Sequence, residues 1–197
     1  MNNPMKSLLQ QALGRDWDKL PPALKAHYHA GPMRETGLMD IEYPRLMQPV
    51  LSVLRYCGAL LNRRGQQLPT VVEKHVVGER QNWLRTIHFP DGQQIQFKSY
   101  LVAGGGNQLI EFVNPLLGLK MLVRVEGGRL HYDGICFVLK LGSVMLPIPE
   151  WLALGHTTIV EEAVDESQFR MDFRLTHPLF RQVFRYAGNF DTRESAV

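Results

Sequence analysis

The sequence predicts an α+β protein that is mainly β: a curved antiparallel meander sheet or incomplete β-barrel, lipocalin-like in outline, with N-terminal helices flanking or capping it. Two observations support this fold class. Apolar residues recur at helical spacing up to about residue 65 and at every second position beyond it. Short turns rich in glycine and proline divide the second part into about nine strands, and so long a meander curls or closes because a wide twisted sheet leaves exposed edges.

Length and composition indicate one domain spanning residues 1–197. The chain is 45% hydrophobic and 21% charged, with a net charge of +3. These are ordinary globular values, and the charge is too small to indicate a nucleic-acid surface. We divide the domain into a mostly helical flank (1–65), an antiparallel sheet (66–191) and a tail (192–197).

The cysteines and the N-terminus favour a cytoplasmic protein without a cofactor. Cys57 and Cys136 lie far apart, show no metal-ligand spacing and are expected to be buried free thiols. The first residues lack the profile of a secretory signal. The most apolar helix candidate, residues 46–61, contains Pro49 and Arg55 and is too short to span a bilayer. The sequence leaves open whether this helix packs on the sheet or touches a membrane surface.

Three helices are expected in the first part. Asn3 and Pro4 form a cap and first turn for a helix that Gly14 ends, a second helix begins at Pro21–Pro22, and a third runs from Pro49 to about Asn62. Residues 32–44, between the second and third helices, are irregular or extended. In this stretch, one face carries Met39, Ile41 and Tyr43.

Turn residues set the register of the predicted hairpins. The turn Pro90-Asp91-Gly92 predicts a three-residue loop that places Ile87 opposite Ile95, Arg85 opposite Phe97 and Trp83 opposite Ser99. A five-residue loop at 103–107 would place Leu101 opposite Leu109 and Ser99 opposite Glu111. The Gly127-Gly128 turn pairs Val125 with Leu130 and Val123 with Tyr132. Residues 147–152 predict a bend with a short helical turn that plugs one end of the sheet.

The hairpin registers direct three polar residues, Arg85, Ser99 and Glu111, toward the apolar face. Glu161 and Glu162 arrive on another strand, where alternation turns one of them inward, and Glu162 is included among the candidate site residues. One interpretation is an internal ion pair that fixes the register. The other is a polar anchor at the floor of an apolar ligand pocket. The walls of that pocket would contain Trp83, Phe97, Met121, Tyr132, Phe169 and Phe173.

Two other signals do not predict sites. His27 and His29 would point to different faces of a helix, so packing or surface roles are favoured over a metal site. The glycines at 104–106 lie between strands and lack the lysine of a phosphate-binding loop.

Short motifs along nearly the whole chain resemble a bacterial domain family of unknown function. This family occurs alone or attached C-terminally to saccharopine-dehydrogenase-like reductases, so the resemblance implies a reductase-type protein partner. It implies no activity. Arg181 departs from the pattern, which has glycine there. The resemblance rests on Leu13-Gly14, Trp17, Leu20-Pro21, His27, Trp83, Arg85, Phe89, Phe97, Ser99, Glu111, Gly128, Leu130, Pro149–Leu152, a glutamate at 161 or 162, Phe169, Pro178-Leu179, Tyr186 and Gly188.

Three functions follow as hypotheses. The first is a binding module for an apolar or lipid-like small molecule, with Arg85 as the anchor of a ligand carboxylate or phosphate. The second is an enzyme acting on an apolar substrate, with Glu111 or Glu162 as the acid/base. The third is an accessory protein-interaction domain without a ligand, with an exposed apolar patch on the helix around residues 50–61.

Overall fold

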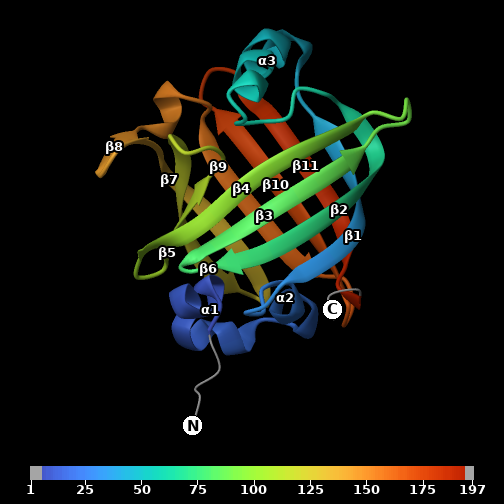
Figure 1. The fold of residues 1–197 in the computed structure, drawn as a ribbon, viewed down its shortest axis with the longest axis vertical. Coiled ribbons are helices and arrows are strands. Elements are labelled where there is room, and N and C mark those ends of the chain that lie inside the picture. The colour runs from blue at the N-terminus through green and yellow to red at the C-terminus, as the bar shows by residue number, and fades with distance from the viewer. Residues whose placement is uncertain (1–5, 194–197) are drawn as a thin grey trace.

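A computed structural model describes residues 6–193, which form a closed antiparallel β-barrel with a helical cover at each end (Figure 1). Ten strands follow the order β6-β5-β4-β3-β2-β1-β11-β10-β9-β7, and pairing of β6 with β7 closes the ring. The remaining strand, β8, pairs with β7 alone. The predicted fold class is confirmed, and the barrel is closed rather than incomplete.

The strands are β1 (Met33–Glu42), β2 (Gly65–Val77), β3 (Arg80–His88), β4 (Gln94–Gly105), β5 (Gln108–Phe112), β6 (Leu117–Glu126), β7 (Arg129–Leu141), β8 (Val144–Ile148), β9 (His156–Ala163), β10 (Gln168–His177) and β11 (Arg181–Asp191). The helices are α1 (Leu8–Leu13), α2 (Pro22–His27) and α3 (Gln48–Tyr56), with short 3-10 segments η1 (Gly14–Lys19), η2 (Arg45–Met47) and η3 (Glu150–Leu152).

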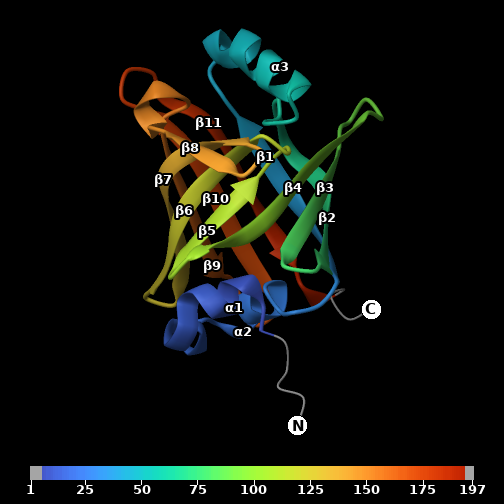
Figure 2. The ribbon, with the colours of Figure 1, turned by 60° about the vertical axis from the view of Figure 1, so that its left-hand side comes forward.

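The helices divide between the two ends of the barrel. Figure 2 shows α1 and α2 across one end and α3 over the other. Ser7 caps α1 by accepting a hydrogen bond from the Gln10 amide at 3.2 Å, and the expected cap at Asn3 and Pro4 lies outside the described residues. The third helix ends at Tyr56, earlier than predicted, because Gly58 takes a φ of 75° and turns the chain.

Strand β1 lies inside the segment 1–65, which we expected to be mostly helical. It pairs with β2 on one side and β11 on the other, so it is an integral barrel strand. Its inward face carries the apolar residues predicted to share a face, Met39 and Ile41. The pairing with β11 is close: a Cβ on Gly188 would lie 2.7 Å from the Leu38 carbonyl oxygen. The absence of a side chain there is therefore a packing requirement.

The hairpin registers were predicted well except at one loop. Trp83 faces Ser99, Arg85 faces Phe97, and the Gly127-Gly128 hairpin pairs as expected. The β4–β5 prediction was wrong, because β4 continues to Gly105 and Leu101 faces Glu111 rather than Leu109. A bulge between Ala103 and Gly105 allows a tighter turn than the expected five-residue loop. The shift is two residues, so every side chain keeps its predicted face.

The apolar core lines the inside of the barrel, and two peripheral predictions were wrong. Cys57, expected to be buried, is exposed at the end of α3, while Cys136 is half-buried. The helical turn η3 forms as predicted, yet Trp151 and Leu152 point to solvent instead of plugging the sheet. No helix within residues 6–193 has the length and apolar character needed to cross a membrane.

Candidate ligand-binding site inside the barrel

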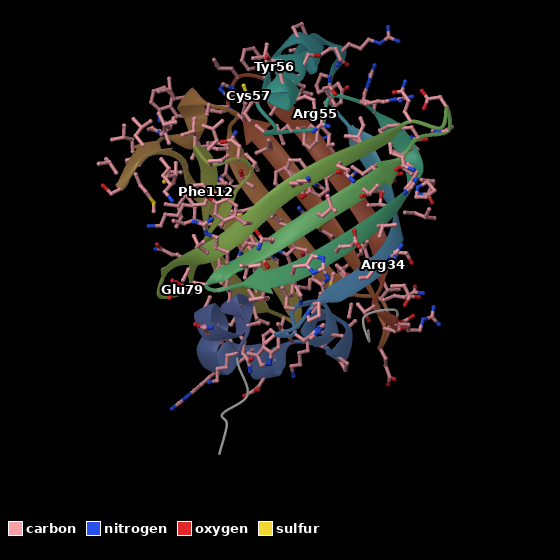
Figure 3. All side chains as sticks on the ribbon, in the orientation of Figure 1. Arg34, Arg55, Tyr56, Cys57, Glu79 and Phe112 are labelled. Carbon is pink, nitrogen blue, oxygen red and sulfur yellow. The ribbon has the colours of Figure 1, made fainter. Side chains whose placement is uncertain are left out.

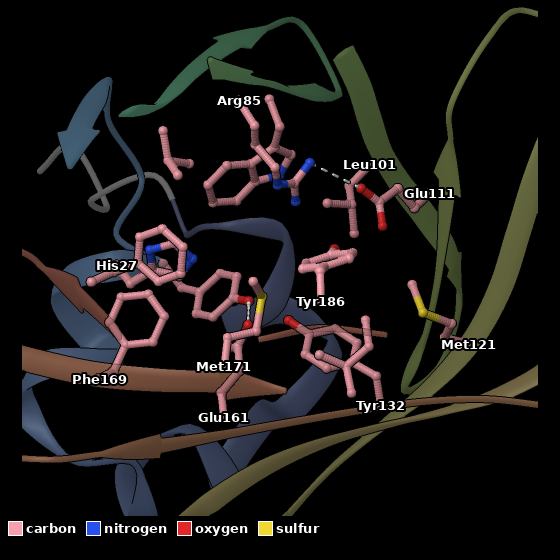
Figure 4. A pocket seen from close by; sticks show the side chains of 15 residues that line it. His27, Arg85, Leu101, Glu111, Met121, Tyr132, Glu161, Phe169, Met171 and Tyr186 are labelled. Carbon is pink, nitrogen blue, oxygen red and sulfur yellow. Dashed lines mark hydrogen bonds and ion pairs between the residues drawn. The ribbon is translucent and has the colours of Figure 1, made fainter. Parts of the chain in front are cut away.

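Three neighbouring strands place a polar relay inside the barrel. Arg85 on β3 donates a hydrogen bond from Nη1 to Ser99 Oγ at 3.0 Å, and Ser99 on β4 donates to Glu111 Oε1 at 2.6 Å. Arg85 Nη1 also lies 3.6 Å from Glu111 Oε1, and the two side chains are 13% and 12% exposed. Figure 4 shows the guanidinium and the carboxylate pointing toward each other across the interior. The structure therefore brings together the three polar residues that the hairpin registers selected.

The guanidinium retains hydrogen-bonding capacity. A guanidinium group has five N–H donors. Within residues 6–193, Arg85 donates one hydrogen bond, to Ser99. Its Cζ atom lies over two aromatic rings, 5.6 Å from the centroid of the Trp83 ring and 5.7 Å from that of the Phe97 ring. Burial lowers the pKa of Arg85, but Tyr186 and Glu111 more than offset this and leave it raised, so the group stays charged.

The inward glutamate of β9 is Glu161, and the expectation that Glu162 lines the interior was wrong. Glu162 lies on the outer face, where it pairs with Arg129 at 2.9 Å and Arg170 at 3.6 Å. Glu161 is 2% exposed and accepts a hydrogen bond from the Tyr28 hydroxyl at 2.9 Å through Oε1. Alternation along β9 required one inward glutamate, but only the register with β10 and β7 decides which one.

Burial is the main influence on Glu161. It raises the pKa of the Glu161 carboxyl, while His27 and the Tyr28 hydrogen bond pull that pKa down and Glu35 opposes them. Its second oxygen, Oε2, is buried and has no hydrogen-bond partner among the described residues. The Trp83 indole nitrogen is in the same situation. Both residues line the same small chamber, so its wall presents an unused donor and an unused carboxyl oxygen.

A second buried polar group joins α2 to the barrel. Lys74 on β2 donates from Nζ to the carbonyl oxygens of His27 at 2.9 Å and His29 at 2.7 Å, at the negative C-terminal end of the helix. His27 Nδ1 lies 2.6 Å from Glu35 Oε2 on β1. Burial lowers the pKa of Lys74 to about 8, against the opposing charge of Glu35. These contacts hold α2 as the floor of the barrel.

Two of the cavities inside the barrel bear on function. The lower one has a volume of about 40 Å³ and contains the chamber walled by Trp83, Arg85, Tyr132 and Glu161. The upper one, beneath α3, has a volume of about 280 Å³. Glu111 and Tyr186 line both cavities. Burial raises the pKa of Tyr186 to about 12, so its hydroxyl remains a donor at neutral pH.

The upper cavity is almost entirely apolar. Apart from Glu111 and Tyr186, its walls are aliphatic, aromatic or glycine, with contributions from α3, from six barrel strands and β8, and from residues 153–154. The lining residues include Val50, Leu54, Leu60, Phe97, Val113, Leu119, Phe137, Leu154, Phe173 and Leu175. An apolar chamber with a few polar groups at one end is the usual composition of a small-molecule site.

Six of the seven predicted site residues face the interior: Trp83, Arg85, Phe97, Ser99, Glu111 and Tyr132. Sequence reasoning left the choice between Glu161 and Glu162 open, and its candidate site lacked Tyr28, Glu35, Lys74 and Tyr186. Alternation could have found two of them, since Glu35 shares its face with Met33 and Met39, and Lys74 with Leu68 and Val72. Tyr28 had no such signal, because its place depends on how α2 closes the barrel. Within residues 6–193 no cluster of three or more His, Cys, Asp or Glu side chains could hold a metal ion.

Comparison of the sequence with models of known families identifies the family of this chain. The family model described as "Domain of unknown function (DUF4166)" matches residues 20–190, most of the chain. The chain belongs to this family. The DUF4166 match covers all eleven strands except the last residue of β11, and it also covers α2 and α3. The search of curated proteins gives no match.

Proposed function

We propose that this DUF4166 domain binds an apolar small molecule in the cavity beneath α3, with the polar end of the ligand directed at Arg85, Glu111 and Tyr186. The observation that supports this most directly is the cavity itself, about 280 Å³ with apolar walls and two polar residues at its lower end. Apolar cavities of this kind stay dry and accept apolar guests. The volume lies near the lower end of the range for ligand pockets, which favours a compact ligand or one chain of a longer amphipathic molecule.

The polar layer suits the head of such a ligand. Arg85 has donors to spare and the Trp83 indole nitrogen is unused, both in the lower chamber, and Tyr186, which lines both cavities, offers a hydroxyl. A carboxylate or phosphate would accept from all three kinds of donor. Because Glu111 already offsets part of the Arg85 charge, a singly charged or neutral oxygen-bearing head fits better than a multiply charged one.

The first experiment is native mass spectrometry of the purified protein, with solvent extraction of whatever it carries. A second measurement titrates the apolar fluorophore 1-anilinonaphthalene-8-sulfonate into a matched pair of variants. Leu54→Trp fills the cavity from α3, whereas Val53→Trp places the same side chain on the exposed face of the helix. We expect Leu54→Trp to lose binding at least tenfold and Val53→Trp to keep it. Equal affinities in the two variants would place the probe elsewhere and refute the proposal.

The anchor role of Arg85 has its own test. The double variant Arg85→Met with Glu111→Leu removes both charges and leaves no unpaired one. We expect it to lose affinity for the extracted ligand, or for the sulfonate probe, while still binding an uncharged hydrocarbon. Unaltered affinity for the charged molecule would show that Arg85 is structural.

A second candidate function is an enzyme acting on a similar apolar substrate, with Glu161 as the acid/base. The observation in its favour is a buried carboxyl with a raised pKa and an unpartnered oxygen. Glu162, one of the two carboxylates first considered, faces outward and cannot take this role. The test is to return the extracted molecule to fresh protein and follow its mass with time. Conversion by wild type but not by Glu161→Gln would support catalysis.

A further inference from the structure

The α3 end of the barrel carries an unusual exposed surface. We infer that this end docks on an anionic lipid bilayer, so that the cavity exchanges its ligand with the membrane. The exchange step rests on the proposed function, whereas the docking does not. The docking surface, which we call the apolar rim, consists of exposed side chains from η2, α3, η3 and the β10–β11 turn: Leu46, Val50, Val53, Tyr56, Trp151, Leu152, Leu179 and Phe180.

The segments of the apolar rim lie at one end of the molecule. The two views of the ribbon place α3, η3 and the β10–β11 turn at the end opposite α1 and α2 (Figures 1 and 2). Figure 3 shows Tyr56 and Cys57 at this end and Glu79 toward the other. His177 Nε2 lies 3.0 Å from the Trp151 carbonyl oxygen, which joins η3 to the β10–β11 turn. The rim is therefore assembled from three separate parts of the chain.

The helix α3 is apolar on two sides. Leu51 is fully buried against the barrel and Leu54 lines the cavity, while Val53 and Tyr56 face solvent, Tyr56 being 95% exposed. A helix with apolar residues beyond its core-facing stripe normally buries the second stripe against something. Tyr56 and Trp151 add two exposed aromatic side chains with polar atoms, the residue types that favour the water-bilayer boundary.

Charge selects an anionic bilayer as the occupant. Residues 43–64, which include η2 and α3, contain four arginines and no aspartate or glutamate. Arg45 and Arg64 are exposed, and Arg63 is held by Asp91 at 2.6 Å. A basic, apolar and aromatic surface helix is typical of segments that lie in the headgroup region of anionic membranes.

The rim also adjoins the wall of the cavity. Val50 belongs both to the rim and to the cavity wall, and Ala153 and Leu154 line the cavity directly after the exposed Trp151 and Leu152. A bilayer in contact with the rim would therefore face the apolar chamber. An apolar ligand could pass between the two without crossing water, which removes the main free-energy cost of its transfer.

Flotation with vesicles tests the docking. The full chain is mixed with vesicles of equimolar phosphatidylglycerol and phosphatidylcholine, or of phosphatidylcholine alone, at low and high salt. We expect wild type to float with the anionic vesicles at low salt and at least tenfold less with the neutral ones. Val53→Glu with Tyr56→Glu should reduce flotation at least tenfold. Val76→Glu with Val77→Glu is the matched control, since it alters an exposed apolar pair at the opposite end.

Several outcomes would overturn the inference. The first is that wild type does not float with anionic vesicles, and the second is that the control variant loses flotation as much as the rim variant does. The third is a wild-type dimer in sedimentation that Val53→Glu with Tyr56→Glu converts to monomer, because the rim would then be a protein interface. Titration with 1-anilinonaphthalene-8-sulfonate in solution separates this failure from that of the proposed function. The rim variant should keep wild-type probe affinity. Probe binding without flotation refutes docking alone, and flotation without probe binding refutes the ligand site and with it the exchange step.

Discussion

The ion pair between Arg85 and Glu111 gives the sharpest test of how the barrel interior is stabilised. At 3.6 Å, the two charges attract by about 4–5 kcal/mol for an effective dielectric constant of about 20. Replacing Arg85 by methionine leaves Glu111 buried with the Ser99 hydroxyl as its one hydrogen-bond donor among residues 6–193. Stranding one charge of a buried pair typically costs about 3–5 kcal/mol. Because both side chains keep some exposure, we expect Arg85→Met to lower the free energy of unfolding by about 3 kcal/mol.

The double variant separates the pair from its parts. Arg85→Met with Glu111→Leu removes both charges and replaces them with apolar groups of similar length. We expect its stability to lie within about 1 kcal/mol of wild type, because the desolvation of both ions is relieved together with their attraction. The measurement is urea denaturation followed by tryptophan fluorescence, with the four members of the cycle compared at one pH.

The outer face of the barrel offers a control pair with the same separation. Arg170 lies 3.6 Å from Glu162, but its side chain is 56% exposed and that of Glu162 is 32% exposed. Arg170→Met should therefore cost less than about 1 kcal/mol. If Arg85→Met costs no more than Arg170→Met, or if the double variant loses the sum of the two single losses, burial of the pair is not what makes it costly to break.

Three further predictions follow from other buried contacts. Because burial raises the pKa of Glu161, its contribution to stability is complete below the unfolded value of about 4.3 and is lost as the pH rises through the folded pKa. As the pH rises from 4.5 to 7.5, the free energy of unfolding of Glu161→Gln, measured in urea titrations, should thus increase relative to that of wild type. Parallel dependences of the two free energies on pH would contradict this. Lys74→Met removes the donor to two carbonyl oxygens at the end of α2 and should lower the free energy of unfolding by about 2–3 kcal/mol. Proteolysis before residue 33 should be faster than in wild type, because α2 is held less firmly against the barrel. Gly37→Ala would drive a Cβ into the Asn189 carbonyl oxygen and should cost about 2 kcal/mol in thermal unfolding. Ala103→Gly, at an exposed position of β4, should cost less than half of that.

Local sequence determined the parts of this protein that depend on near neighbours along the chain. Alternation separates inward from outward residues within each strand, and turn residues fix the register of the hairpins around 90–92 and 127–128. These two signals were enough to place Arg85, Ser99 and Glu111 on one face and to predict that they meet. The β4–β5 loop shows the limit of the signal, since a bulge and a five-residue loop preserve the same faces and differ only in register.

Only the tertiary structure decided the contacts between segments far apart in sequence. Closure through β6 and β7, the inward choice of Glu161 over Glu162, and the position of Tyr28 against Glu161 all depend on which strands become neighbours around the ring. The same holds for the cavity beneath α3, whose walls come from residues 50, 97, 154 and 175 among others, and for the rim. Periodicity reports the environment of one segment at a time. The pairing of distant segments is set by the summed burial of the whole chain, which no local pattern contains.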